Sequence, residues 1–190
     1  MSAPLFDTAR NPVLLIIDIQ NAIDADYHAA AGPRNNIDAE QNIASLLAHW
    51  RARSAVVIHI RHDSLDAGSA YLPGQSGNDF KSEAAPLANE RIIAKQTNSA
   101  FIGTDLEPAL RALACDALFV TGVATNNSVE ATVRMAGNLG FNTYLIADAC
   151  FTFARRDYDD RLRSAAEVHA MSLANLDGEY CRVITLREAI

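Results

Sequence analysis

The sequence contains little cysteine and no segment that marks secretion or a membrane. Its three cysteines, Cys115, Cys150 and Cys181, lie far apart in apolar contexts and lack the spacing of a metal site. An odd number of scattered cysteines favours buried thiols in a reducing cytoplasm over disulfides. The first ten residues lack the charged-then-apolar pattern of a leader, and no apolar run approaches the length of a membrane span. We therefore expect a cytoplasmic protein without a membrane partner.

Clusters of basic residues are also missing. The chain has 16 Lys and Arg residues against 23 Asp and Glu residues, a formal net charge of −7, which argues against nucleic acid as a partner. The hydrophobic fraction is 49%, ordinary for a globular protein. A chain of 190 residues is long enough for one full core, so we expect a single domain over residues 1–190 that acts on a small molecule.

Short apolar runs alternate with segments of helical period along the whole chain. The runs predict strands, and the amphipathic segments predict helices. Strict alternation of this kind predicts an α/β fold, a parallel sheet with helices on both faces and right-handed crossovers. The expected strands are 13–18, 55–60, 91–94, 117–121, 143–147 and 181–185, and the expected helices are 38–53, 105–113, 125–139 and 158–175. Residues 20–36 and 62–77 are expected to be loops, and long loops in compact domains are more often functional than idle.

The stretch 118–138 carries the strongest local signal. A β-branched apolar run is followed by a tight exit at 122–125 and then by a helical pattern, which places Ser128 in the first turn of a helix. Free backbone N–H groups and the helix dipole favour negative charge at such a turn. Asp18 and Lys95 end two other expected strands. Because sites in parallel sheets lie beyond the carboxyl ends of strands, near a reversal of strand order, we expect these three side chains to converge.

Four segments together resemble the isochorismatase-like cysteine hydrolases: LLIIDIQNAI, RIIAKQTNSAFIGTDL, VTGVATNNSVEATVRMAGNLGF and YLIADACFTF. The resemblance extends from about residue 13 to residue 185. It implies a Rossmann-like, three-layer α/β/α sandwich with a six-stranded parallel sheet. Family members include hydrolases of amide and carbamoyl C–N bonds, and also isochorismatase, which cleaves a vinyl ether. Members are commonly homodimers or homotetramers, and the resemblance implies the same here.

Position by position, the resemblance implies catalytic roles for Asp18, Lys95 and Ser128, with Ser128 in the place of the catalytic cysteine. It also implies a cis peptide bond before Ala124 and an oxyanion hole made by the backbone N–H groups of Ala124 and Ser128. In the amidase members an aspartate, a lysine and a cysteine carry out the reaction. We therefore expect a hydrolase of a small amide or carbamoyl substrate.

The serine at position 128 is the main departure from that pattern. A thiol there would gain thiolate character from the helix N-terminus and Lys95, and Asp18 could carry its proton. A serine starts far less acidic, which makes it a doubtful amidase nucleophile. Three interpretations remain open: an engineered Cys→Ser change that inactivates the enzyme, a divergent enzyme of the isochorismatase type that relies on the aspartate, or an inactive relative that binds a ligand.

Other residues are candidates for binding a metal or the substrate, or for packing. The spacing His59-x-x-His62 suggests a metal, but the acid that metal-binding relatives carry nearby is absent, so we expect a site without metal or other cofactor. We expect Gln20, His62, Phe101 and Thr125 to bind substrate, with specificity supplied by the loops 20–34 and 62–77. Cys150 is expected to be an inert buried thiol. His169 is expected to serve packing or an interface.

Overall fold

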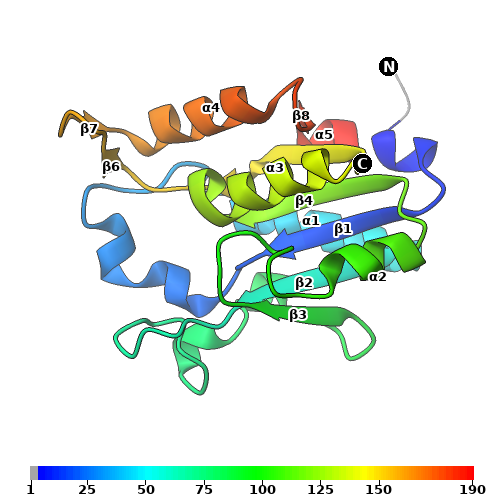
Figure 1. Ribbon diagram of the computed structural model, residues 1–190, viewed down its shortest axis with the longest axis horizontal. Coiled ribbons are helices and arrows are strands. Elements are labelled where there is room, and N and C mark those ends of the chain that lie inside the picture. The colour runs from blue at the N-terminus through cyan, green and yellow to red at the C-terminus, as the bar shows by residue number, and fades with distance from the viewer. Residues whose placement is uncertain (1–3) are drawn as a thin grey trace.

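The computed structural model describes residues 4–190, so the first three residues of the expected 1–190 domain lie outside the described part. Its centre is a six-stranded sheet in the order β3-β2-β1-β4-β5-β8, in which each neighbouring pair runs parallel (Figure 1). The strands are β1 (Pro12–Ile17), β2 (Val56–His62), β3 (Arg91–Lys95), β4 (Ala117–Val123), β5 (Thr143–Phe151) and β8 (Arg182–Ile184).

Helices cover both faces of this sheet. One face packs against α1 (Ala39–Ala52) and α5 (Leu186–Ala189). The other face packs against α2 (Leu106–Ala112), α3 (Glu130–Asn138) and α4 (Ala165–Leu176). The predicted three-layer α/β/α fold is therefore confirmed. Within residues 4–190, every helix falls short of the length and apolar character that a membrane crossing needs.

Strand β1 shows why its sequence is apolar without a break. Leu14 and Ile16 point into the core beneath α1, which also contains Trp50. Val13, Leu15 and Ile17 point into the core on the opposite face. Both faces of a central parallel strand are buried, so both sets of alternate positions must be apolar.

The strand order reverses between β1 and β4. From β1 the chain proceeds to β2 and β3 on one side, and then returns to β4 on the other side of β1. The carboxyl ends of β1 and β4 are therefore neighbours at the point where ligands of open α/β sheets bind. The 20–36 segment, expected to be a loop, lies at this edge and contains two short helical turns, η2 (Asn21–Asp24) and η3 (Asp26–Ala29).

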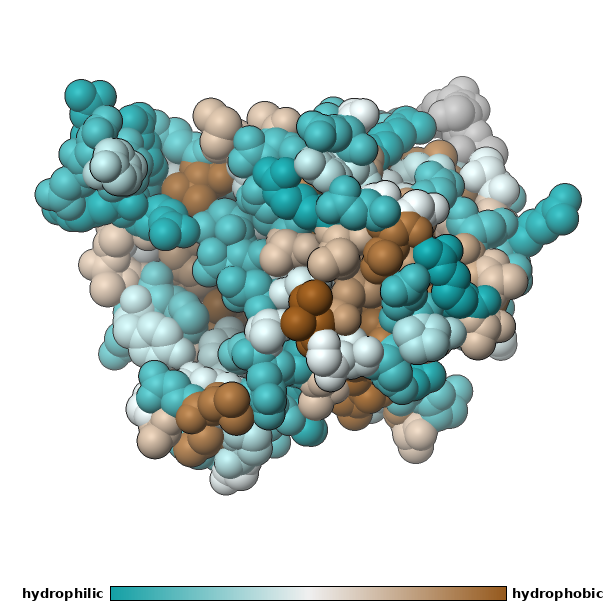
Figure 2. All heavy atoms as spheres, in the orientation of Figure 1, coloured by the Kyte–Doolittle hydropathy of each residue, from teal (hydrophilic) through white to brown (hydrophobic). Residues whose placement is uncertain are grey.

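The prediction of one helix over 158–175 is wrong in its first third. Two short strands, β6 (Arg155–Arg156) and β7 (Leu162–Arg163), form an antiparallel hairpin, and α4 begins only at Ala165. Ser164 and Glu167 form a reciprocal capping box that fixes this start. Hydrophilic side chains gather over the hairpin at the upper left of Figure 2, as expected for an exposed turn.

Candidate active site

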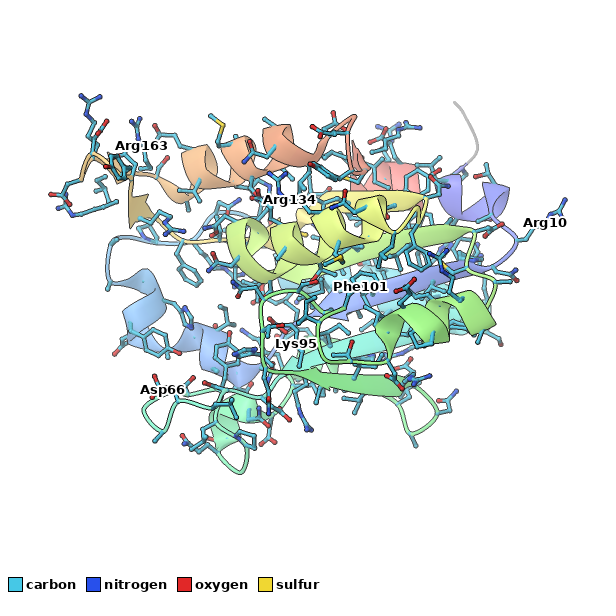
Figure 3. The ribbon with its side chains drawn as sticks, in the orientation of Figure 1. Arg10, Asp66, Lys95, Phe101, Arg134 and Arg163 are labelled. Carbon is cyan, nitrogen blue, oxygen red and sulfur yellow. The ribbon has the colours of Figure 1, made fainter. Side chains whose placement is uncertain are left out.

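Three side chains from separate parts of the chain meet at the carboxyl edge of the sheet. Asp18 follows β1, Lys95 ends β3 (Figure 3), and Ser128 lies in the helical turn η6 (Thr125–Val129) that follows β4. Lys95 Nζ donates to Asp18 Oδ2 at 2.7 Å and to Ser128 Oγ at 3.2 Å. The convergence that the strand ends predicted is confirmed.

The backbone turns sharply at Asp18 so that its side chain leaves the sheet toward this cluster. Its φ of 54° lies in the left-handed region, which aspartate tolerates better than most residues. Gly122 lies beside it at the end of β4, with a φ of 133°. A Cβ at Gly122 would lie 2.2 Å from the carbonyl oxygen of Ile17. Only glycine therefore lets β4 approach the end of β1 closely enough to bring η6 against Asp18.

Lys95 is fully buried, and its ammonium group is surrounded by acceptors. Besides Asp18 and Ser128, Nζ contacts the carbonyl oxygen of Thr97 at 3.0 Å and Nδ1 of His62 at 3.4 Å. An ammonium group has three N–H donors and no acceptor, and the three nearest oxygens, on Asp18, Thr97 and Ser128, can accept all three. This arrangement compensates for the large cost of removing a charge from water.

Asp18 is buried, and its carboxylate is only half satisfied. Burial raises its pKa above the ordinary value, and the Lys95 ammonium acts in the opposite direction. Oδ2 is bound to Lys95, whereas Oδ1 is buried with no hydrogen-bond partner among the residues that the structure describes. Buried polar atoms without partners are rare, and this one belongs to a residue that lines the cavity, where a ligand or water can donate to it.

The turn around Ala124 presents backbone groups to the same place. The Val123–Ala124 peptide bond is cis, as the resemblance implies. The Ala124 carbonyl accepts N–H bonds from Asn127 at 3.0 Å and from Val129 at 3.3 Å, so η6 is wound as a wide π-type turn. Such turns occur frequently at functional sites. Ser128 is 7% exposed, so its hydroxyl is almost entirely enclosed.

A small cavity of about 180 Å³ opens above these groups. It is smaller than the pockets that take drug-sized ligands. Besides Asp18 and Ser128, the lining consists of Ile23, Tyr27, His28, His62, Tyr71, Asn98, Val123, Ala124 and Asn127. The groove between the β6–β7 hairpin and α4 is larger, about 860 Å³, but it does not contain the Asp18–Lys95–Ser128 cluster.

Several of these lining residues were not singled out by their sequence. Tyr27 and His28 come from the first long loop and Tyr71 from the second. Both loops were predicted to supply specificity, and they do contribute to the cavity. Loop residues show no period that reveals which side chain turns inward, so the segments could be identified but the individual residues could not.

Of the four predicted substrate-binding residues, His62 lines the cavity and the other three do not. Gln20 is buried and hydrogen-bonds the backbone of His62 through both ends of its amide. Thr125 points beneath η6, where its hydroxyl lies 2.9 Å from Nδ1 of His169. Phe101 stacks on Phe141 in the core beside α2 and α3 (Figure 3). The structure thus gives these three side chains supporting positions.

The remaining candidate groups have structural partners. His59 is buried and its Nε2 lies 3.0 Å from Glu90, on the opposite side of β2 from His62. No group of three His, Cys, Asp or Glu side chains suited to a metal ion occurs in the described part of the chain. Burial raises the pKa of the Cys150 thiol to about 12, consistent with an inert thiol. His169 packs beneath η6, as predicted for a packing histidine.

The chain is similar to known proteins in sequence and in fold. Residues 12–185 match the model of the isochorismatase domain. The isochorismatase family protein YrdC of Bacillus subtilis is 41% identical over 177 residues, 93% of this chain and 93% of that protein. A maleamate amidohydrolase of Pseudomonas putida is 27% identical over 195 residues, 95% of this chain and 86% of its own. A crystal structure from the isochorismatase family of Chromobacterium violaceum matches with a TM-score of 0.93 and 58% identity, over 99% of this chain and 96% of that one.

Proposed function

The chain belongs to the isochorismatase family of hydrolases, and from that premise we propose that it hydrolyses a small amide or carbamoyl C–N bond at the Asp18–Lys95–Ser128 cluster. The observation that carries the proposal is the position of Lys95 Nζ, between Asp18 Oδ2 at 2.7 Å and Ser128 Oγ at 3.2 Å, at the base of the cavity. The similarity to a maleamate amidohydrolase supports the choice of a C–N bond.

In this mechanism Asp18 is the proton carrier. Its unpartnered Oδ1 accepts the Ser128 hydroxyl proton while Oγ attacks the substrate carbonyl carbon. The tetrahedral oxyanion is held by the backbone N–H groups of Ala124 and Ser128. Asp18 then returns the proton to the leaving nitrogen as the C–N bond breaks. Water repeats the sequence on the ester and releases the acid.

The two charged groups have complementary tasks. Lys95 keeps Oδ2 of Asp18 in place and stabilises negative charge that develops on Ser128 Oγ. Burial raises the pKa of Asp18, which makes its carboxylate a better base than an exposed one. A serine hydroxyl is nevertheless far less acidic than a thiol. We therefore propose that the Ser128 form is a slow or inactive version of a site built for a cysteine.

A second function has one observation in its favour. A buried aspartate whose pKa is raised is a general acid, which is the group that a vinyl ether needs for protonation. Such a reaction requires no nucleophile at position 128. C–N hydrolysis depends on a nucleophile at position 128, whereas vinyl-ether cleavage does not. A third possibility, ligand binding without turnover, requires neither Asp18 nor Ser128 as a catalyst.

The test compares the serine form with Ser128→Ala and Ser128→Cys on a panel of small amides, carbamoyl compounds and vinyl ethers. Hydrolysis of C–N bonds predicts that Ser128→Cys releases ammonia several orders of magnitude faster than Ser128→Ala. Iodoacetamide should block that activity and label residue 128, whereas Ser45→Cys on the exposed side of α1 should take the label without effect on turnover. Vinyl-ether cleavage that survives in Ser128→Ala, together with an inert cysteine form, would establish the second function instead.

A further inference from the structure

His62 is held more firmly than its place at a loop junction requires. Its backbone N–H donates to Oε1 of Gln20 at 2.7 Å, and its carbonyl accepts from Nε2 of Gln20 at 3.1 Å and from Nδ2 of Asn78 at 2.9 Å. Gln20 and Asn78 are both buried. Two amide side chains therefore fix the backbone of a residue that lines the cavity.

The ring of His62 is fixed as well. It packs edge-on against Tyr71, with ring centroids 5.4 Å apart, and Tyr71 is held by Nδ2 of Asn78, which donates to its carbonyl oxygen at 2.9 Å. The same Asn78 amide thus holds both His62 and the aromatic ring beside it. Neither His62 nor Tyr71 takes part in the proposed proton transfers.

Lys95 favours one tautomer of His62. Nδ1 lies 3.4 Å from the Lys95 ammonium, and a lone pair that faces this cation is electrostatically more stable than an N–H group in the same place. The proton of the neutral ring is then on Nε2. Burial and the charge of Lys95 lower the pKa of His62, so the ring is neutral at pH 7. Nε2 has no hydrogen-bond partner within residues 4–190, so its N–H is available to a molecule in the cavity.

The cavity that receives this N–H offers no unpaired charge to a ligand. Asp18 is the one acidic side chain that lines it within the described chain, and it forms an ion pair with Lys95. Burial lowers the pKa of His28, as it does for His62, so both rings are neutral. A carboxylate placed here would lose its hydration without gaining a free counter-charge, which is costly.

We propose that His62 is a specificity-determining residue whose Nε2–H donates to a neutral acceptor oxygen of the substrate, so that the site prefers small uncharged amides or ureides to analogues with a carboxylate at that point. This inference rests on the proposed function, because it concerns the substrate of the same site. It assigns to Gln20 and Asn78 the role of positioning residues that act through His62.

The experiment measures binding and not turnover. Isothermal titration calorimetry compares succinamide, an uncharged diamide, with succinamate, its half-amide carboxylate, at pH 7.5. We expect succinamide to bind more tightly. His62→Phe, which keeps the ring against Tyr71 but has no N–H, should weaken succinamide binding about 3- to 10-fold. His62→Gln, which can place an N–H near the position of Nε2, should restore most of that loss. His49→Phe on α1, away from the cavity, should bind like the parent.

A pH series separates recognition from a structural role. The groups that face His62 are Lys95 on β3, Asp18 after β1, and Asp63 and Tyr71 in the following loop, with His28 in the cavity lining. As the pH falls, protonation of His62 adds positive charge to the cavity, which favours succinamate. Protonation of Asp18 has the same effect on the charge of the cavity. The preference for succinamide should therefore decrease in the parent protein and in His62→Phe, and the decrease should be smaller in His62→Phe.

Tighter binding of succinamate at pH 7.5, unchanged succinamide binding in His62→Phe, or no binding of either ligand at millimolar concentration would overturn the proposal. Absence of hydrolysis would count against the proposed function alone, because the binding result does not depend on turnover.

Discussion

The ammonium nitrogen of Lys95 lies 2.7 Å from Oδ2 of Asp18, although the two residues are 77 positions apart in the sequence. Both side chains are buried, and β1, β2 and β3 bring them together by ending at the same edge of the sheet. The pair is therefore a product of topology, and it supplies the cavity with one carboxylate oxygen that is held and one that is free.

Removal of the cation should destabilise the fold. Lys95→Met leaves the Asp18 carboxylate buried without its partner, which typically costs about 3–5 kcal/mol at neutral pH. Burial already raises the pKa of Asp18, and loss of Lys95 raises it further, so the cost should shrink as pH falls and the carboxyl becomes neutral. Urea denaturation at pH 7.5 and pH 5 measures both effects. The double variant with Asp18→Asn should recover part of the loss. An equal loss at both pH values, with no recovery, would contradict this account.

Glu90 should contribute stability that is also lost as pH falls, in this case because its partners lower the pKa of its carboxyl group. Burial acts to raise its pKa, but hydrogen bonds from Arg51, the Leu87 N–H group and His59 lower it to about 2. The stabilisation is therefore present above the unfolded-state pKa near 4.5 and is lost as pH falls toward 2. Glu90→Gln should cost about 2 kcal/mol at pH 7 and much less near pH 3. Thermal denaturation of both proteins between pH 7 and pH 3 measures how the cost of Glu90→Gln changes with pH. A cost that increases on acidification would refute the prediction.

Two glycines offer a matched comparison of close approach and backbone conformation. Gly122 and Gly140 both have positive φ, but a Cβ at Gly122 would lie 2.2 Å from the Ile17 carbonyl, while nothing lies within 4 Å of a Cβ at Gly140. Gly140→Ala should therefore cost only about 1 kcal/mol. Gly122→Ala should cost more than about 4 kcal/mol and displace Asp18 from Ser128. Similar denaturation midpoints for the two variants would show that β4 does not depend on this close approach.

The position of the Asp18–Lys95–Ser128 cluster could be predicted because strand ends are a regular property of the fold. Asp18 and Lys95 each follow an apolar run, and parallel strands end at one edge whatever the loops do. The inward-facing loop residues could not be predicted, because Tyr71 is held by individual contacts, among them hydrogen bonds with Asn78 and Ser69, and not by any local period.

The predicted substrate-binding roles of Gln20 and Thr125 show a different limit. Gln20 lies two residues from Asp18 and Thr125 lies three residues from Ser128, and this proximity in sequence suggested contact with substrate. Side chains leave a tight turn in different directions, however, and these two point into the scaffold beneath it.

The start of α4 was predicted too early although the sequence contained a signal for it, since Ser164 and Glu167 have the spacing of a capping box.

The most direct test of the central claim is the ammonia-release rate, as kcat/KM on one small amide, for four forms: the serine protein, Ser128→Cys, Asp18→Asn and the double variant. The account predicts that Ser128→Cys raises the rate by about 10³-fold or more, and that Asp18→Asn abolishes nearly all of this gain, because groups that act as a unit are not additive. A cysteine form no faster than the serine form, or a gain that survives Asp18→Asn, would contradict it.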